Sequence, residues 1–119
     1  WRRIAGRLDV EGAQAPWREG ERRHLTIRLR NHGPARWLAA RHALGGTAIV
    51  CQLFDESGAD LFARDPWLAL ERDLEPGEGT SFQITVRRPV GRARLRIEPR
   101  ILGRQPMWQL GGPAWESEL

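Results

Sequence analysis

Alternation of apolar and polar residues is the feature that most constrains the fold of this chain. Residues 24–31 place Leu25, Ile27 and Leu29 at every second position, with polar side chains between them. Residues 80–87 and 92–99 repeat the pattern, with the apolar set Phe82, Ile84, Val86, Ala93, Leu95 and Ile97. Because successive side chains of a strand point to opposite faces, each segment has one apolar face and one wet face. Three such segments predict antiparallel sheets that bury their apolar faces.

Turn-forming residues separate these segments at the spacing of a small β-domain. They occupy 31–34 (NHGP), 55–58 (DESG), 75–79 (EPGEG) and 88–91 (RPVG). Further strands are expected at 4–10, 47–54, 59–64 and 106–110, and a short helix is compatible only with 35–44. The pattern predicts an all-β chain, an immunoglobulin-like antiparallel β-sandwich of about seven to eight strands.

The length of 119 residues suits a single domain spanning 1–119, with its core at roughly 4–110 and a loose, turn-rich tail at 111–119. Because the first residue is Trp1, we expect a segment of a longer protein. No apolar run reaches the roughly 18 residues of a membrane span, and no signal-peptide pattern is visible. Membrane insertion is therefore not expected, and the cytoplasm is the default compartment. The single cysteine, Cys51, follows an apolar run and is expected to be a buried hydrophobe rather than a catalytic thiol.

All nineteen basic residues are arginine, and they give a formal net charge of +4. The lack of lysine indicates the codon bias of a GC-rich, bacterial genome rather than selection for a binding surface. Fifteen acidic residues are interspersed with the arginines, which favours solvated strand faces over a phosphate-binding patch. Nucleic acid is thus a disfavoured partner. It stays open only if Arg28, Arg30, Arg94 and Arg96 share one wet sheet face.

The polar residues form no recognised catalytic or metal-binding motif. His24, His32 and His42 lack the companions of a metal site, and no nucleophile elbow or phosphate-binding loop is present. Carboxylate pairs within turns do not face each other across a cleft, as a glycosidase requires. We therefore expect a chain that is not an enzyme and has no catalytic residue, no metal ligand and no cofactor.

Six tryptophans are many for so short a chain. An indole either fills a core or offers a flat recognition surface. Trp37 and Trp108 lie just outside alternating segments and are expected to close the ends of the sandwich. Trp17 and Trp67, in turn-rich surroundings, are the candidates for exposure.

Carbohydrate is the ligand that an exposed tryptophan would suit, because a sugar ring stacks its C–H face on an indole. Arg64, Asp65 and Gln52 lie near Trp67 in the predicted fold and would bond the sugar hydroxyls. The candidate ligand-binding set is therefore Trp67, Arg64, Asp65, Gln52 and Trp17. Packing of Trp67 in the core or at an edge is the favoured alternative.

The order of several landmarks resembles a known family. Asn31-His32-Gly33 precedes Trp37, and the hairpin at 54–58 is followed by Leu74-Glu75-Pro76-Gly77-Glu78. The strand 82–86, then Pro89, Gly91 and Leu95, then Met107-Trp108 and Gly111-Gly112 complete the order over roughly 22–112. This order resembles the Ig-like module appended to bacterial glycosyltransferases and methyltransferases that build surface polysaccharides. It is also similar in outline to the four-tryptophan Ig-like domain of autophagy cargo receptors.

The resemblance implies structural roles for turn and core residues, namely Asn31, Gly33, Trp37, Pro76, Gly77 and Trp108. Arg94 or Leu95 stands where the family has an aromatic residue. The implied function is that of a non-catalytic accessory module of a glycan-assembly protein, which binds carbohydrate or orients a neighbouring domain of the parent polypeptide. The alternative is a protein–protein interaction module that uses an edge strand or an exposed tryptophan.

Overall fold

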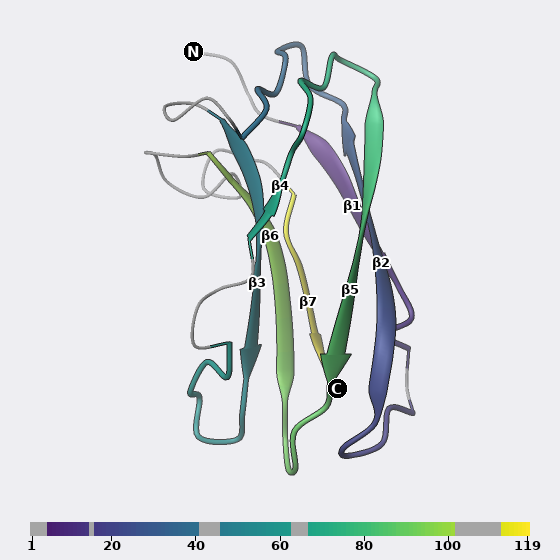
Figure 1. Cartoon of the computed structure of the whole chain (residues 1–119), viewed down its shortest axis with the longest axis vertical. Helices are drawn as coiled ribbons and strands as arrows, with labels where there is room; N and C mark the ends of the chain where they lie inside the picture. The colour runs from purple at the N-terminus through teal and green to yellow at the C-terminus, as the bar shows by residue number, and fades with distance from the viewer. Residues whose placement is uncertain (1–4, 15, 41–45, 63–66, 102–112) are drawn as a thin grey trace.

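The computed structural model describes residues 5–14, 16–40, 46–62, 67–101 and 113–119. Within these ranges the chain is all-β, and its strands form two antiparallel sheets that face each other (Figure 1). The strands are β1 (Gly6–Glu11), β2 (Arg22–Asn31), β3 (Thr47–Phe54), β4 (Trp67–Ala69), β5 (Gly79–Arg87), β6 (Arg94–Ile101) and β7 (Trp115–Glu118). One sheet has the order β1-β2-β5 and the other β4-β3-β6-β7. The described residues contain no helix long and apolar enough to cross a membrane.

The alternation in β2 and β5 builds one wall of the core. Leu25 pairs with Ile84 and Ile27 with Phe82 across the two strands. Leu25 and Ile27 are fully buried, and Leu29 is nearly so. Because the polar residues between them face outward, the predicted alternation of both segments is confirmed.

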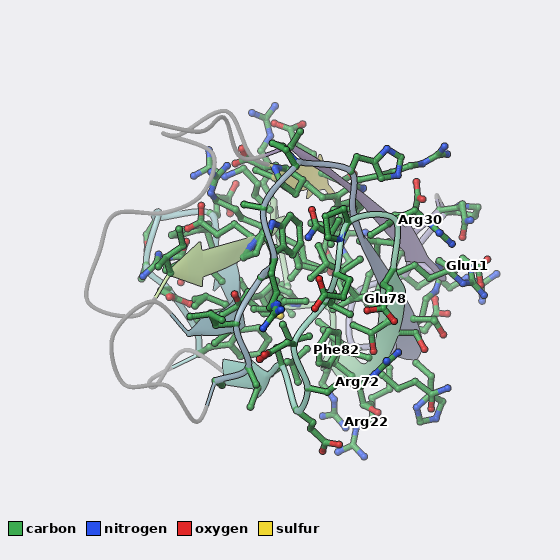
Figure 2. All side chains as sticks on the ribbon, turned by 90° about the horizontal axis from the view of Figure 1, so that it is seen from above. Glu11, Arg22, Arg30, Arg72, Glu78 and Phe82 are labelled. Carbon is green, nitrogen blue, oxygen red and sulfur yellow. The ribbon has the colours of Figure 1, made fainter. Side chains whose placement is uncertain are left out.

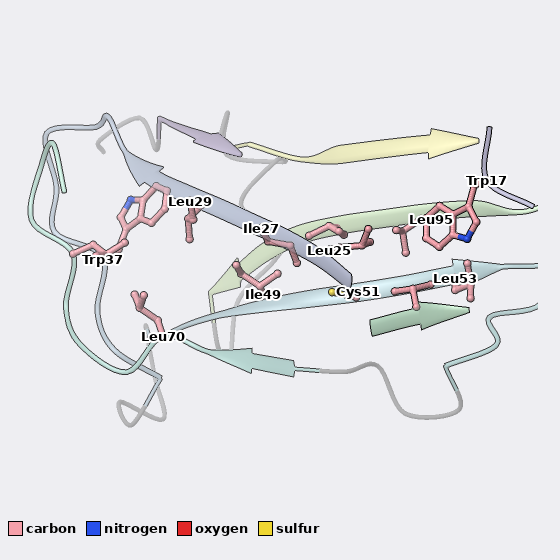
Figure 3. Close-up of a cluster of buried hydrophobic side chains, with 13 residues drawn as sticks. Trp17, Leu25, Ile27, Leu29, Trp37, Ile49, Cys51, Leu53, Leu70 and Leu95 are labelled. Atoms are coloured by element: carbon pink, nitrogen blue, oxygen red, sulfur yellow. The ribbon is translucent and has the colours of Figure 1, made fainter. Parts of the chain in front are cut away.

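Strand β3 builds the opposite wall and has the bounds predicted for it, 47–54. Ile49, Cys51 and Leu53 face the other sheet and belong to its core (Figure 3). Ala48 and Val50, which point the other way, are buried as well. A strand buried on both faces carries a continuous apolar run, which explains why this segment does not alternate. Cys51 is fully buried, as expected.

Two tryptophans lie at opposite ends of this core (Figure 3). Trp37 is 4% exposed, and a side chain at Gly6 would come within 2.5 Å of its ring. Trp17 is 2% exposed, which corrects the expectation that it faces solvent. Its ring packs inward because its polar group is satisfied locally: Nε1–H donates to the Glu21 carbonyl at 2.9 Å. Trp108, expected to close one end, lies outside the described residues.

Three local expectations need correction. The described part of the possible helix, 35–40, is extended, because Trp37 and Leu74 exchange backbone hydrogen bonds of 2.9 and 2.8 Å. The described part of the strand expected at 59–64 forms only an isolated bridge, between Phe54 and Asp60. The tail expected to be loose instead contains β7, which pairs with β6 from Arg94 to Ile97. The strand expected at 106–110 lies outside the described residues.

Candidate functional site

A hollow of about 260 Å³ lies at the end of the sandwich where the chain leaves β3, enters β6 and ends after β7. This is the lower end in Figure 1. The wall combines the ring of Phe54 with three arginines and three carboxylates: Arg88, Arg92, Arg94, Asp55, Glu56 and Glu118. The hollow thus offers an aromatic surface, positively charged hydrogen-bond donors and negatively charged hydrogen-bond acceptors.

The aromatic part of this wall is held by a neighbouring strand. Phe54 and Arg94 lie directly opposite each other on β3 and β6. The Arg94 guanidinium carbon lies 4.8 Å from the Phe54 ring centroid, within the range of a cation–π contact. Arg94 Nε also donates to Glu116 Oε1 at 2.7 Å. The arginine is therefore oriented at both ends, and the ring beneath it has a defined position.

Asp55 shapes the turn beside the hollow. Its Oδ1 accepts hydrogen bonds from the Ser57 hydroxyl at 2.6 Å, the Ser57 backbone N–H at 2.9 Å and the Ala59 N–H at 3.0 Å. Gly58 completes the turn with a φ of 86°, a conformation that glycine adopts without strain. The hydrogen bond from Ser57, followed by those from the backbone, lowers the pKa of Asp55 below its ordinary value.

Replacing Ser57 by alanine is expected to raise the pKa of Asp55 back towards its ordinary value, because the largest cause of the shift is removed. A carboxyl whose folded pKa is depressed contributes stability above its unfolded pKa and loses it as the pH falls through the folded pKa. The stability that Asp55 loses on acidification should therefore be smaller in Ser57→Ala, and this loss should be complete at a higher pH than in the unchanged chain. A titration of the Asp55 carboxyl followed by NMR measures this shift, with Ser81→Ala as control. An unchanged Asp55 pKa in Ser57→Ala would contradict the assignment.

The residues predicted to bind a ligand are only partly brought together. Gln52 is half-buried on β3, and the backbone of Trp67 pairs with Val50, two residues before Gln52. These two positions therefore lie on neighbouring strands of one sheet. Arg64, Asp65 and the side chain of Trp67 lie outside the described residues. The buried Trp17 offers no surface to a ligand.

Asn31 connects several segments from inside the structure. It is fully buried, and its Nδ2 donates to the Leu74 carbonyl at 3.0 Å. Its Oδ1 accepts from the Gly33 N–H at 2.9 Å. The turn that carries Pro76 and Gly77 is attached to the same residue, because the Gly77 N–H donates to the Asn31 carbonyl at 2.7 Å. Gly77 has a φ of 88°, a value that favours glycine. These contacts hold the end of β2 to the chain before β5.

The arginines considered for nucleic-acid binding do not share a face. Arg28 and Arg30 extend from β2 in one sheet, whereas Arg94 and Arg96 extend from β6 in the other. Their polar faces point in opposite directions because the apolar faces of both sheets meet in the core. Arg28 also pairs with Glu11. The common basic face on which the disfavoured nucleic-acid alternative depended is therefore not formed by these four arginines.

The outer face of β6 instead carries a connected chain of ion pairs. Glu116 accepts from Arg94 at 2.7 Å and from Arg96 at 3.2 Å. Glu98 accepts from Arg96 at 3.1 Å and from Arg100 at 2.9 Å. The Glu98 side chain is 3% exposed, although the alternation had placed it on a wet face. The arginines two residues before and after Glu98 could have indicated this pairing in the sequence, since residues i and i+2 of a strand share a face.

A groove of about 590 Å³ lies between β4 and β5, the facing edge strands of the two sheets. Leu68 and Phe82 contribute apolar surface to it, and Glu71 and Arg72 contribute charge. The sequence did not reveal this groove, because alternation identifies strands without their order in a sheet. Among the described residues, no group of three histidine, cysteine or acidic side chains is placed to hold a metal ion.

The strands define a two-sheet all-β domain. Comparison with known proteins shows a similarity of fold. No protein-family model and no curated protein matches the chain. Among solved structures it is similar to the sporulation control protein Spo0M from Bacillus subtilis, with 13% sequence identity and a TM-score of 0.53. The match covers 97% of this chain and 48% of that one, so this chain spans about half the length of Spo0M.

Proposed function

We propose that this chain is an immunoglobulin-like, non-catalytic accessory module of a bacterial glycan-assembly protein. We further propose that it binds carbohydrate in the hollow beside Phe54. The glycan-assembly context rests on the resemblance of the landmarks from Asn31 to Trp108. The binding role rests on the composition of the hollow.

The strand order supports the immunoglobulin-like part of this proposal. With the strands lettered A to G along the chain, the two sheets are A-B-E and D-C-F-G. A constant-type immunoglobulin domain has the sheets A-B-E-D and C-F-G. The two arrangements differ only in the fourth strand, which here pairs with the third strand rather than the fifth. Sandwiches of this architecture often vary in their exact topology.

The hollow carries the carbohydrate part of the proposal. A binding site for a polar ligand needs an apolar surface and a few oriented polar groups. The Phe54 ring supplies the surface for the C–H face of a sugar. Arg92 and Arg94 supply donors, and the Glu118 carboxylate accepts hydrogen bonds from hydroxyls. These groups come from β3, β6, β7 and the connection before β6, so the ligand would contact several segments at once.

A titration of the 119-residue chain with a panel of neutral and uronic-acid-containing bacterial oligosaccharides tests this proposal. Amide shifts observed by NMR should be confined to residues 54–58, 88–94 and 116–119. Phe54→Ala should weaken binding by about fivefold or more, since an aromatic contact is worth about 1 kcal/mol. Arg92→Ala should also weaken binding while leaving the Phe54 ring in place.

Val90→Ala is the matched control. Val90 lies in the same β5–β6 connection as Arg92, but it is 78% exposed and does not line the hollow. It should bind as the unchanged chain does. The carbohydrate proposal fails if no oligosaccharide in the panel shifts these amides. It fails equally if Phe54→Ala and Arg92→Ala both bind as Val90→Ala does.

Contact with another protein is the second candidate function, and the exposed edge of β5 beside the groove favours it. A strand edge with unpaired backbone groups accepts an additional strand. The groove is distinct from the hollow, since the two share no lining residue. Both functions are therefore compatible with one module.

A further inference from the structure

Strand β5 is the longest edge strand in the part of the chain that the structure describes. It has nine residues, whereas the other edge strands, β1, β4 and β7, have six, three and four. It lies at an edge because β4, the preceding strand, pairs with β3 in the opposite sheet. The side of β5 away from β2 thus has no neighbouring strand among the described residues.

The hydrogen bonds at both ends of β5 show which backbone groups face this edge. The Glu78 carbonyl accepts from the Asn31 N–H at 2.9 Å, and the Arg88 N–H donates to the Glu21 carbonyl at 3.0 Å. Both residues have even numbers, and bonding alternates along an antiparallel pair. The even-numbered residues of β5 therefore bond to β2. Residues 79, 81, 83, 85 and 87 direct their N–H and C=O groups away from it.

Natural edge strands usually carry features that prevent pairing, such as proline, lysine, inward charges or short length. Residues 79–86 contain no proline and no charged residue, and Arg87 alone is charged, at the strand's end. Phe82 and Ile84 are half-buried on the inner face, and Phe82 lines the groove shared with Leu68. Figure 2 shows Phe82 and Arg72 on the same side of the molecule. This edge is therefore open to a further strand.

The sequence of β5 is complementary to itself. In an antiparallel pair of two copies centred on Gln83, Phe82 of one copy faces Ile84 of the other on the inner side. Ser81 faces Thr85 on the outer side, and Gln83 faces Gln83. Arg87 faces Gly79 of the second copy, which has no side chain to oppose it. No like charges face each other, and the pairs formed by residues 81–85 each join residues of the same polarity; outside them, Thr80 faces Val86.

We propose that two copies of this chain pair through β5, antiparallel and centred on Gln83, and form one continuous six-stranded sheet. The three-stranded sheet of each copy supplies half of it. The odd-numbered residues then exchange backbone hydrogen bonds across a two-fold axis. The grooves beside Phe82 in the two copies lie next to this junction. This inference is independent of carbohydrate binding in the hollow beside Phe54.

Two substitutions that place opposite charges at position 83 test the pairing. Sedimentation of the 119-residue chain over about a hundredfold range of concentration should show a monomer–dimer equilibrium. Gln83→Lys and Gln83→Glu each place like charges directly opposite, so each variant alone should dimerise up to about fivefold more weakly at low salt. An equimolar mixture of the two should dimerise again, because lysine then faces glutamate.

Thr26→Lys is the matched control. Thr26 lies directly opposite Gln83 on β2 and shares its outer face, but it is one strand further from the two-fold axis. The two lysines would then lie about three strand spacings apart, near 14 Å, where their repulsion is much weaker than between directly opposed side chains. Thr26→Lys should therefore dimerise as the unchanged chain does. A chain that stays monomeric throughout, or a mixture that fails to restore dimers, would overturn the proposal.

Discussion

Replacing Asn31 by alanine is expected to lower the free energy of unfolding by about 3 kcal/mol. The side chain makes three hydrogen bonds: Nδ2 donates to the Ala35 and Leu74 carbonyls at 2.8 and 3.0 Å, and Oδ1 accepts from the Gly33 N–H at 2.9 Å. Alanine would leave these backbone groups without their partner, two of them at buried hydrogen bonds and one at a part-buried one. A buried group that loses its partner costs more than the bond itself contributes.

Urea denaturation followed by tryptophan fluorescence measures this loss as a lower transition midpoint. Asn31→Asp keeps the shape of the side chain but presents an oxygen to two carbonyl oxygens, so it should lose a comparable amount. His32→Ala is the control, since His32 is exposed at the next position, and it should change stability by less than about 0.5 kcal/mol. If Asn31→Ala were no less stable than His32→Ala, the buried hydrogen bonds would not hold these segments together.

Replacing Glu98 by alanine is the second change with a large expected effect, a loss of about 3 kcal/mol. The carboxylate is 3% exposed between Arg96 and Arg100, whose side chains are 21% and 28% exposed. Removal of one member of a buried pair leaves the other charges uncompensated. The loss should lie at the lower end of the usual range, because both arginines still reach water.

Glu116→Ala is the matched control within the same chain of ion pairs. Glu116 contacts Arg94 and Arg96 but is 37% exposed, so its removal should cost less than about 1 kcal/mol. Glu98→Gln should fall between the two, because it keeps the volume and loses the charge. Thermal and urea unfolding of the three variants measures the order. Equal losses in Glu98→Ala and Glu116→Ala would show that burial does not strengthen these pairs.

The period of the apolar residues predicted most of the strands. Leu25, Ile27 and Leu29 lie on the core face where the alternation placed them, and β3 spans the predicted residues. The C-terminal strand was missed because Trp115–Glu118 is a run of only four residues with three polar members. Its stability comes from pairing with β6 and from Arg94 contacting Glu116, which are contacts between distant positions.

The candidate site was less predictable than the fold. Phe54, Arg94 and Glu118 are far apart in sequence and meet only because β3, β6 and the C-terminus reach the same end of the sandwich. Trp17 was assigned to the surface because proline and charged residues surround it. In the fold its ring is buried in the core, and Arg88 donates to the Trp17 carbonyl from a position far along the chain. Local composition does not contain that information.

The pairing of β2 with β5 has a consequence for how the molecule reaches this structure. His24 lies opposite Thr85, and the chain between them contains all of β3 and β4. During synthesis, β1 and β2 therefore leave the ribosome well before the strand that pairs with the free edge of β2. Domains dominated by such distant pairings fold in milliseconds to seconds, more slowly than helical bundles. Until β5 arrives, the backbone edge of β2 that it pairs with is open to other chains, and that interval is when a nascent copy is most exposed to aggregation.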